Sequence, residues 1–231
     1  MKSTSLHIIL ASLAAVVVCV ALYLVFFVAP TEATLGIVQK IFYFHVASAM
    51  NMSLAFGVCA IAGAVYLLAK SDKWRKRADA LGVATAEAGV MLGAMVMVTG
   101  PLWAKVAWGT YWTWEPRLTL SLMVFLLFVA YLALRAYAGS DAFGRSIAAG
   151  LAILGLPGLY FIRVAVERWG GAHPQVIYKG GLSHPAMRQA FFASIAAMLL
   201  VSASLVVLRF LIERRRQTLD ELFLEADKIF G

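Results

Sequence analysis

The chain contains little cysteine and little charge, and each shortage argues against a class of protein. Its two cysteines, Cys19 and Cys59, lie inside apolar runs, without a CxxC pair or a neighbouring histidine. A disulfide framework or a cysteine metal site is therefore disfavoured, and both thiols are expected to be small apolar filler. Only 14% of the 231 residues are charged, whereas 62% are hydrophobic. Such a chain is not that of a soluble domain, so lipid is expected to be its main solvent.

The chain also lacks an internal repeat, and its apolar runs lack any alternation of polar and apolar residues. Repeat-type transporters show matched broken helices, so the missing repeat argues against a solute permease. Backbone groups in lipid pair only within helices or around a closed barrel, and the missing alternation favours helices. The net charge of +8 is interpreted first as a topology signal and only second as a sign of nucleic-acid binding.

What the chain has instead is a series of long apolar runs, each near the ~20 residues that a helix needs to cross ~30 Å of hydrocarbon. We expect membrane-spanning helices at about 6–29, 41–69, 80–103, 118–137, 146–166 and 189–212. The predicted fold is an all-α integral membrane protein, a bundle of six transmembrane helices that forms a single domain over residues 1–231. The first run is longer than the apolar part of a signal peptide and is expected to remain as a span.

The basic residues predict how this bundle is oriented. The segments KSDKWRKR, after the second run, and RRR, after the last run, lie next to span ends on one side of the bundle. By the positive-inside rule this side is cytoplasmic, and both termini are expected there. The long loops, at about 30–40, 104–117 and 167–188, all fall on the opposite, outer side. Because long loops often carry function, the outer face is expected to be the working face.

The outer loop at 104–117 contains an unusual density of aromatic residues, in the segment WGTYWTWEPRLT. The candidate site residues from this region are Trp103, Trp108, Trp112, Trp114, Glu115 and Arg117. An aromatic belt at the lipid interface explains one or two rings per span end, but it explains poorly this density and the adjacent acid and base. The alternative is a flat apolar shelf for a flat apolar ligand, since ligand sites combine aromatic walls with a few placed polar groups.

Three of the four histidines, His45, His173 and His184, lie on the same predicted face. Taken singly, a histidine is more often a hydrogen-bonded structural residue than a ligand. Two imidazoles from separate segments can nevertheless supply both axial positions of a haem iron. His184 also has a structural interpretation, because Ser183-His184-Pro185 resembles the start of a helix. The residues alone leave open which two histidines would form the pair.

A haem also carries two propionates, and the outer basic residues are candidate partners for them. Arg117 is the best candidate because its planar guanidinium matches a carboxylate. The further candidates are Lys40, Lys105, Arg163, Arg168 and Arg188. Glu87 is the one acid deep in a predicted span, where acids are usually functional or paired. No charged partner for Glu87 is visible in the sequence, although nearby Thr85 could satisfy it, and no role is assigned to this acid.

Four segments together resemble a known family: VTGPLWAKVAWGTYWTWEPRLT, FYFHVASA, VERWGGAHPQ and HPAMR. They are similar to the tryptophan-rich, WWD-type family of haem-handling proteins of cytochrome c maturation. Within it the resemblance, over most of the chain, is greatest to the haem exporter protein C family, also called cytochrome c maturation protein C. The chain departs from the family pattern at Glu115, where Asp is common, and at Tyr111, which replaces a common second tryptophan.

The resemblance implies a non-covalent, b-type haem at the periplasmic face of a bacterial inner membrane, with His45 and His173 as axial ligands. It implies haem delivery, not catalysis, with the membrane-anchored haem chaperone, protein E of cytochrome c maturation, as the recipient. A small membrane protein D and the ATP-binding-cassette proteins A and B are the other implied partners.

Two other functions remain as alternatives. One is a haem lyase subunit that attaches haem to apocytochrome c, although lyase relatives are usually longer, with more spans and histidines. The other is a b-type electron-transfer membrane protein, which is expected to place histidine pairs within its helices. Here only His45 clearly lies in a predicted span.

Overall fold

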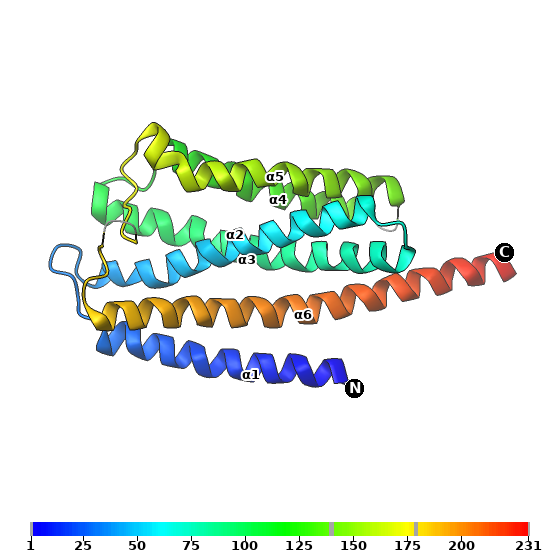
Figure 1. The fold of residues 1–231 in the computed structure, drawn as a ribbon, viewed down its shortest axis with the longest axis horizontal. Helices are drawn as coiled ribbons and strands as arrows, with labels where there is room; N and C mark the ends of the chain where they lie inside the picture. The colour runs from blue at the N-terminus through cyan, green and yellow to red at the C-terminus, as the bar shows by residue number, and fades with distance from the viewer. Residues whose placement is uncertain (1, 139–140, 178–179, 231) are drawn as a thin grey trace.

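The computed structural model describes residues 2–138, 141–177 and 180–230. Its α-helices are α1 (Lys2–Tyr23), α2 (Ile41–Leu68), α3 (Asp72–Trp108), α4 (Pro116–Ala138), α5 (Ala142–Trp169) and α6 (Pro185–Phe230). Six helical segments, one for each of these helices, are long and apolar enough to cross a membrane. The helices run along a common axis as a bundle (Figure 1). The predicted fold class, an all-α bundle of six membrane helices, is therefore confirmed.

The two ends of this bundle differ in what they carry. The connections from α1 to α2, from α3 to α4 and from α5 to α6 meet at one end, here called the loop end (Figure 1). The other end, here called the terminal end, carries both chain termini, the short α2–α3 and α4–α5 connections, and the projecting last turns of α6. The basic segments that predict the cytoplasmic side belong to the terminal end. The orientation relative to the membrane stays a prediction from those basic residues.

Helices α3, α4, α5 and α6 extend further at both ends than the apolar runs that predicted them, which shortens the outer loops. α3 continues through Trp108 and ends where Gly109 adopts a left-handed φ of 78°, a conformation that suits glycine. α4 begins at Pro116, so the loop expected at 104–117 is reduced to 109–115. The loops expected at 30–40 and 167–188 are shortened in the same way, by the 3-10 helix Ile37–Lys40 and by α5 and α6. An uncharged run marks the part of a helix in hydrocarbon, whereas the helix itself continues until a residue ends it.

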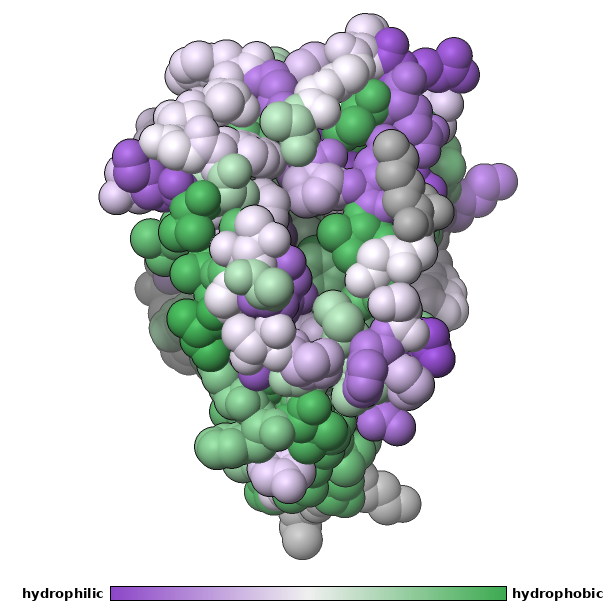
Figure 2. All heavy atoms as spheres, turned by 90° about the vertical axis from the view of Figure 1, so that its left-hand side faces the viewer, coloured by the Kyte–Doolittle hydropathy of each residue, from purple (hydrophilic) through white to green (hydrophobic). Residues whose placement is uncertain are grey.

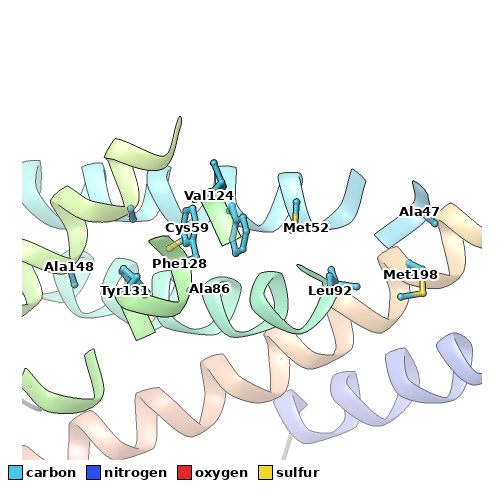
Figure 3. Close-up of a cluster of buried hydrophobic side chains, with 12 residues drawn as sticks. Ala47, Met52, Cys59, Ala86, Leu92, Val124, Phe128, Tyr131, Ala148 and Met198 are labelled. Carbon is cyan, nitrogen blue, oxygen red and sulfur yellow. The ribbon is translucent and has the colours of Figure 1, made fainter. Parts of the chain in front are cut away.

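The buried core lies between α2, α3, α4, α5 and α6. Phe56 of α2 stacks on Phe128 of α4, with ring centroids 3.8 Å apart and an interplanar angle of 3°. A side chain at Gly89 of α3 would meet the Phe56 ring at 2.4 Å, so the glycine permits this close approach. Figure 3 shows Cys59 beside Phe128 in the same cluster. Cys59 is a buried free thiol and Cys19 an exposed one, in keeping with their interpretation as small apolar side chains.

Lys40 joins the end of α1 to the start of α2. Its side chain is buried, and its ammonium donates to the carbonyls of Val25 at 2.7 Å, Phe26 at 3.2 Å and Ala29 at 3.1 Å. These carbonyls belong to the π-helix Leu24–Val28 that continues α1 and to the residue after it. Carbonyls at a helix C-terminus lack partners within the helix and attract cations. All three donors of the ammonium are used, so the expectation that Lys40 pairs with a haem propionate is wrong.

Glu87 of α3 pairs with Arg209 of α6, a partner that was not visible in the sequence, and not with nearby Thr85. Arg209 donates through Nε and Nη2 to the two carboxylate oxygens, with Nη2 2.5 Å from Oε1. The Thr85 hydroxyl instead donates to the carbonyls of Leu81 at 2.8 Å and Gly82 at 3.1 Å. Sequence reasoning sought a local partner, whereas the true partner is 122 residues away in the chain. The bidentate pair is part-buried and joins α3 to α6.

Candidate functional site

A cavity of about 410 Å³ opens at the loop end. Its volume lies within the range of small-molecule and cofactor sites. Its walls come from the α1–α2 connection, the first turns of α2, α4 and α6, the last turns of α3, the 109–115 loop and the segment that follows α5. Figure 2 looks onto this end and shows hydrophobic residues exposed between hydrophilic ones. The cavity is therefore a mainly apolar space with a few polar groups in its walls.

Most of the predicted site residues line this cavity, although they come from α2, α3, the 109–115 loop, α4 and the segment after α5. The residues concerned are His45, Trp103, Trp108, Trp112, Arg117 and His173. The fold thus brings both histidines and the arginine to the same space as three of the tryptophans. Trp114 and Glu115 were also predicted, but they do not line it.

The tryptophans pack edge to face rather than as one flat shelf. Trp103 and Trp108 have ring centroids 5.5 Å apart at an interplanar angle of 89°. Trp112 and Trp114 are 5.9 Å apart at 76°, and the Trp114 side chain is 76% exposed. Such edge-to-face contacts are favourable for aromatic rings. Trp103, Trp108 and Trp112 therefore form cavity walls, whereas Trp114 packs on the outside of Trp112, where the two border a shallow depression with Met97.

His45 lies in the second turn of α2, and its Nδ1 is 2.9 Å from the hydroxyl oxygen of Thr99 on α3. Thr99 lies one helical turn before Trp103, so the helix that supplies two of the tryptophan walls also contacts the histidine. Sequence reasoning did not identify Thr99. Its spacing of four residues from Trp103 places both on one face of α3, and this was the only signal in the sequence.

His173 lies in the segment after α5, outside the membrane-spanning helices. Its Nδ1 is 3.1 Å from the carbonyl oxygen of Pro174, which accepts but cannot donate. Nδ1 therefore carries the proton, and Nε2 keeps its lone pair. Burial lowers the pKa of His173 to about 3, with further contributions from the positive charge of Arg117 and from His45. The ring is thus neutral at physiological pH, the form that binds a metal.

Glu115 connects the tryptophan loop to the segment that carries His173. Its Oε2 accepts a hydrogen bond from the backbone N–H of Ala172 at 2.6 Å. A side chain at Gly171, whose φ is 140°, would lie 2.8 Å from the same oxygen, so the glycine lets the carboxylate approach the backbone. Glu115 therefore holds the residue before His173, and its contact with a ligand stays a prediction.

The remaining outer cations were candidate propionate partners, but none of them lines the cavity. Lys105 donates to the carbonyl of Gly109 at 2.9 Å, and Arg188 donates to the carbonyl of Ser183 at 3.1 Å. Arg163 lies 3.9 Å from Glu167 in the next turn of α5, and Arg168 is exposed at the end of that helix. Arg117, in the first turn of α4, is thus the candidate that the fold brings to the cavity.

His184 is the outer histidine that lies outside the cavity. Its Nδ1 accepts a hydrogen bond from the backbone N–H of Ala186 at 3.1 Å, directly before Pro185 begins α6. The predicted helix start at Ser183-His184-Pro185 is therefore confirmed, and the His184 side chain caps it.

Glu32, in the α1–α2 connection, lines the cavity and was not identified from the sequence. Its carboxylate accepts hydrogen bonds from the backbone N–H groups of Leu35 at 2.6 Å and Thr34 at 2.9 Å. These bonds favour the ionised carboxylate and lower the pKa of Glu32. No recognisable spacing in the sequence marks this residue.

These features define a class: a multi-pass helical membrane protein whose loop end holds a tryptophan-lined cavity with two histidines and an arginine. Such a cavity suits a flat, apolar ligand that carries acidic groups and a metal. The family model described as Heme exporter protein C matches residues 2–225 of the chain. The chain belongs to this family, whose members function in cytochrome c maturation.

Curated relatives agree with this family. The chain is 33% identical over 210 residues to Heme exporter protein C of Escherichia coli, which covers 87% of this chain and 82% of the relative. It is 32% identical over 158 residues to Heme exporter protein C of Bradyrhizobium diazoefficiens, covering 67% and 58% of the two chains. The protein of the same name from Paracoccus denitrificans is 26% identical over 207 residues, covering 87% and 84%.

Proposed function

We propose that this protein binds haem in the loop-end cavity, with His45 and His173 as the axial ligands of the iron. The observation that carries the proposal is that two histidines from distant segments line one cavity together with Trp103, Trp108 and Trp112. The tryptophan rings would contact the macrocycle, and Arg117 would pair with a propionate. The haem is cargo, bound without a covalent link, as in a b-type protein.

The residues present fit this ligand. Within the described residues there is no group of three or more His, Cys, Asp or Glu that could hold a bare metal ion. A pair of imidazoles is instead what an iron needs when a porphyrin supplies the other four ligands. The indole N–H of Trp112 is buried in the cavity region and has no hydrogen-bond partner among the described residues, so it is available to a polar group of the ligand.

We further propose that the protein presents haem at the periplasmic face of the bacterial inner membrane and delivers it to the haem chaperone, protein E. The positive-inside rule supports a periplasmic loop end, because the basic segments lie at the terminal end. His173 lies on a non-helical segment after α5, so it can leave the iron without disturbing a helix. Protein D and the ATP-binding-cassette proteins A and B are proposed as the other partners.

The ligand assignment is tested by substitution of the histidines. Purified protein is expected to show a low-spin, b-type haem spectrum, which His45→Ala together with His173→Ala should abolish. His184→Ala is the matched control, because His184 is also a loop-end histidine but caps α6. The ligand assignment is wrong if the double variant keeps the haem content of the wild type.

Delivery is tested by incubating the haem-loaded protein with the purified chaperone domain in the absence of apocytochrome c. Haem that appears on the chaperone supports delivery. A haem lyase subunit would instead require apocytochrome c for turnover, and an electron-transfer protein would retain its haem through cycles of reduction and oxidation. Either result would overturn delivery while leaving the ligand assignment intact.

A further inference from the structure

Two hydrogen bonds connect the candidate ligand His45 to the backbone of α3 through Thr99. His45 Nδ1 lies 2.9 Å from Thr99 Oγ1, and Thr99 Oγ1 lies 2.6 Å from the carbonyl oxygen of Met95. The three groups form a short relay that runs from the imidazole of α2 to a carbonyl of α3. Among the described residues, Thr99 supplies the side chain that forms a hydrogen bond with His45.

The chemistry of the relay fixes which way each bond points. The Met95 carbonyl can only accept, so the single hydroxyl proton of Thr99 is donated to it. Thr99 Oγ1 can then only accept at its other side, so His45 Nδ1 must carry the proton that it donates. Nε2 of His45 is consequently left with a free lone pair. His173 reaches the same tautomer by a different route, through the carbonyl of Pro174.

The backbone of α3 also approaches the His45 ring directly. A side chain at Gly100 would lie 3.2 Å from Cε1 of His45, the carbon between the two ring nitrogens. Thr99 and Gly100 are consecutive residues, so one turn of α3 sets both the hydrogen bond and the position of the ring. A rigid helix thus holds this imidazole.

We propose that Thr99 is a positioning residue for haem binding, which holds His45 in the Nδ1–H tautomer so that Nε2 is available to the iron. The inference rests on the proposed role of His45 as an axial ligand. A hydrogen bond from Nδ1 orients a ligating imidazole and makes it a stronger donor, and loss of such a bond typically weakens metal binding about 10–100-fold. A stronger donor favours ferric over ferrous iron.

The test compares Thr99→Val with Thr99→Ser in the full-length protein purified in detergent. Valine preserves the shape of threonine but removes the hydroxyl, whereas serine retains it. Thr99→Val should weaken haem binding by about 10-fold or more. It should also shift the haem midpoint potential to a more positive value, and Thr99→Ser should stay near the wild type in both measurements.

Thr85→Val is the matched control, because Thr85 lies on the same helix and its hydroxyl also donates to a carbonyl four residues earlier. This variant should leave haem affinity and potential unchanged. The inference is overturned if Thr99→Val and Thr85→Val behave alike, or if the serine variant fails to rescue. It is also overturned if Thr99→Val binds haem as the wild type does while His45→Ala loses it. If His45→Ala itself keeps its haem, the proposed function fails instead.

Discussion

Both ends of the bundle bury polar groups, but at the terminal end three helices bind one buried carboxylate, whereas at the loop end several buried polar atoms have no partner among the described residues. At the terminal end, Asp79 of α3 accepts hydrogen bonds from Arg135 of α4 at 3.0 Å and Gln217 of α6 at 2.9 Å. Arg145 of α5 lies 3.4 Å from the same carboxylate. At the loop end, the indole nitrogen of Trp112 and Oε1 of Glu115 are buried with no partner in the described part of the chain.

This difference in pairing indicates a structural role for the terminal end and a ligand-binding role for the loop end. The charges of the terminal end join four helices, and Glu213 adds a second acid 3.8 Å from Arg135. Arg135 keeps two nitrogens without a partner there, but its Nη2 is held by Asp79. At the loop end the unpaired indole nitrogen of Trp112 belongs to a residue that lines the cavity, which is the arrangement of a ligand site. We infer that the terminal end holds the bundle together so that the loop end can keep an open space.

The largest effect is expected from breaking the terminal end at Asp79. Asp79→Leu leaves Arg135 as a buried charge without its main partner, and this should cost about 3–5 kcal/mol of stability. The measurement is unfolding of the purified protein in detergent by titration with a denaturing surfactant. The haem spectrum of the fraction that remains folded should be unchanged, since the substitution is far from the cavity.

Asp72→Asn is the control for this comparison. Its side chain is 72% exposed and pairs with Lys76 within one helical turn, so its loss should cost below about 1 kcal/mol. Equal effects of the two substitutions would contradict a structural role for the buried network. A change of haem affinity in stable Asp79→Leu protein would show that the two ends are coupled.

The next largest effect is expected at Glu115, which should alter haem binding without altering stability. Glu115→Ala removes the hydrogen bond to Ala172 and frees the segment that carries His173. Haem should then dissociate about 10-fold faster, equivalent to about 1.4 kcal/mol. The rate is measured by transfer of haem to excess apomyoglobin.

Glu115→Gln keeps the length of the side chain and an oxygen that accepts, so it should lie between alanine and the wild type. If alanine and glutamine release haem at the wild-type rate, Glu115 does not position His173. If Glu115→Ala lowers the stability of the protein as much as Asp79→Leu does, the contrast between the two ends is wrong.

A smaller effect is expected from filling the space beside His45. Gly100→Ala places a methyl group 3.2 Å from Cε1 of the ring, so the ring must shift by a few tenths of an ångström. Haem affinity should fall a few-fold while the protein remains folded, because coordination depends on the position of the ring. Equilibrium haem titration measures the change.

Gly57→Ala in α2 is the matched substitution, because a side chain at Gly57 meets nothing within 4 Å. It should leave haem affinity unchanged and raise stability by up to about 1 kcal/mol, since alanine is a better helix former. A wild-type affinity for Gly100→Ala would show that the approach of α3 to the ring does not matter.

The smallest effect is expected from protonation of Glu32 at the mouth of the cavity. Backbone N–H groups of Leu35 and Thr34 lower its pKa below 4.5, so the folded loop favours the ionised carboxylate. This contribution to loop stability is complete above pH 4.5 and is lost as the pH falls through the lowered pKa of the folded state. Amide chemical shifts of Thr34 and Leu35 should titrate with a midpoint below 4.5, and Glu32→Gln should abolish the titration. A midpoint at or above 4.5 would contradict the hydrogen bonds.

Much of the fold could be predicted because hydropathy and net charge are properties of local segments. The six apolar runs predict six helices, and all six helices are found. Helix ends were less predictable, because α3 runs past its apolar part until Gly109 ends it. The candidate histidines could be named because few residue types bind haem iron. Which of them share a cavity depends on how the helices are rotated and packed, and no pattern of spacing contains that information.

The amino-acid pattern alone indicates a six-helix membrane protein, its tryptophan-rich segment and the histidines that could bind a metal, because these follow from residue chemistry and short-range order. Packing decides the rest. It places Arg209 against Glu87, turns Lys40 toward the end of α1, leaves Trp114 outside the cavity and sets Thr99 beside His45. Each of these results joins residues that are distant in the chain or selects one of two sides for a side chain. Long-range contacts and the side on which a side chain lies both depend on how whole helices are rotated relative to one another. That rotation is set by the packing of the helices against one another.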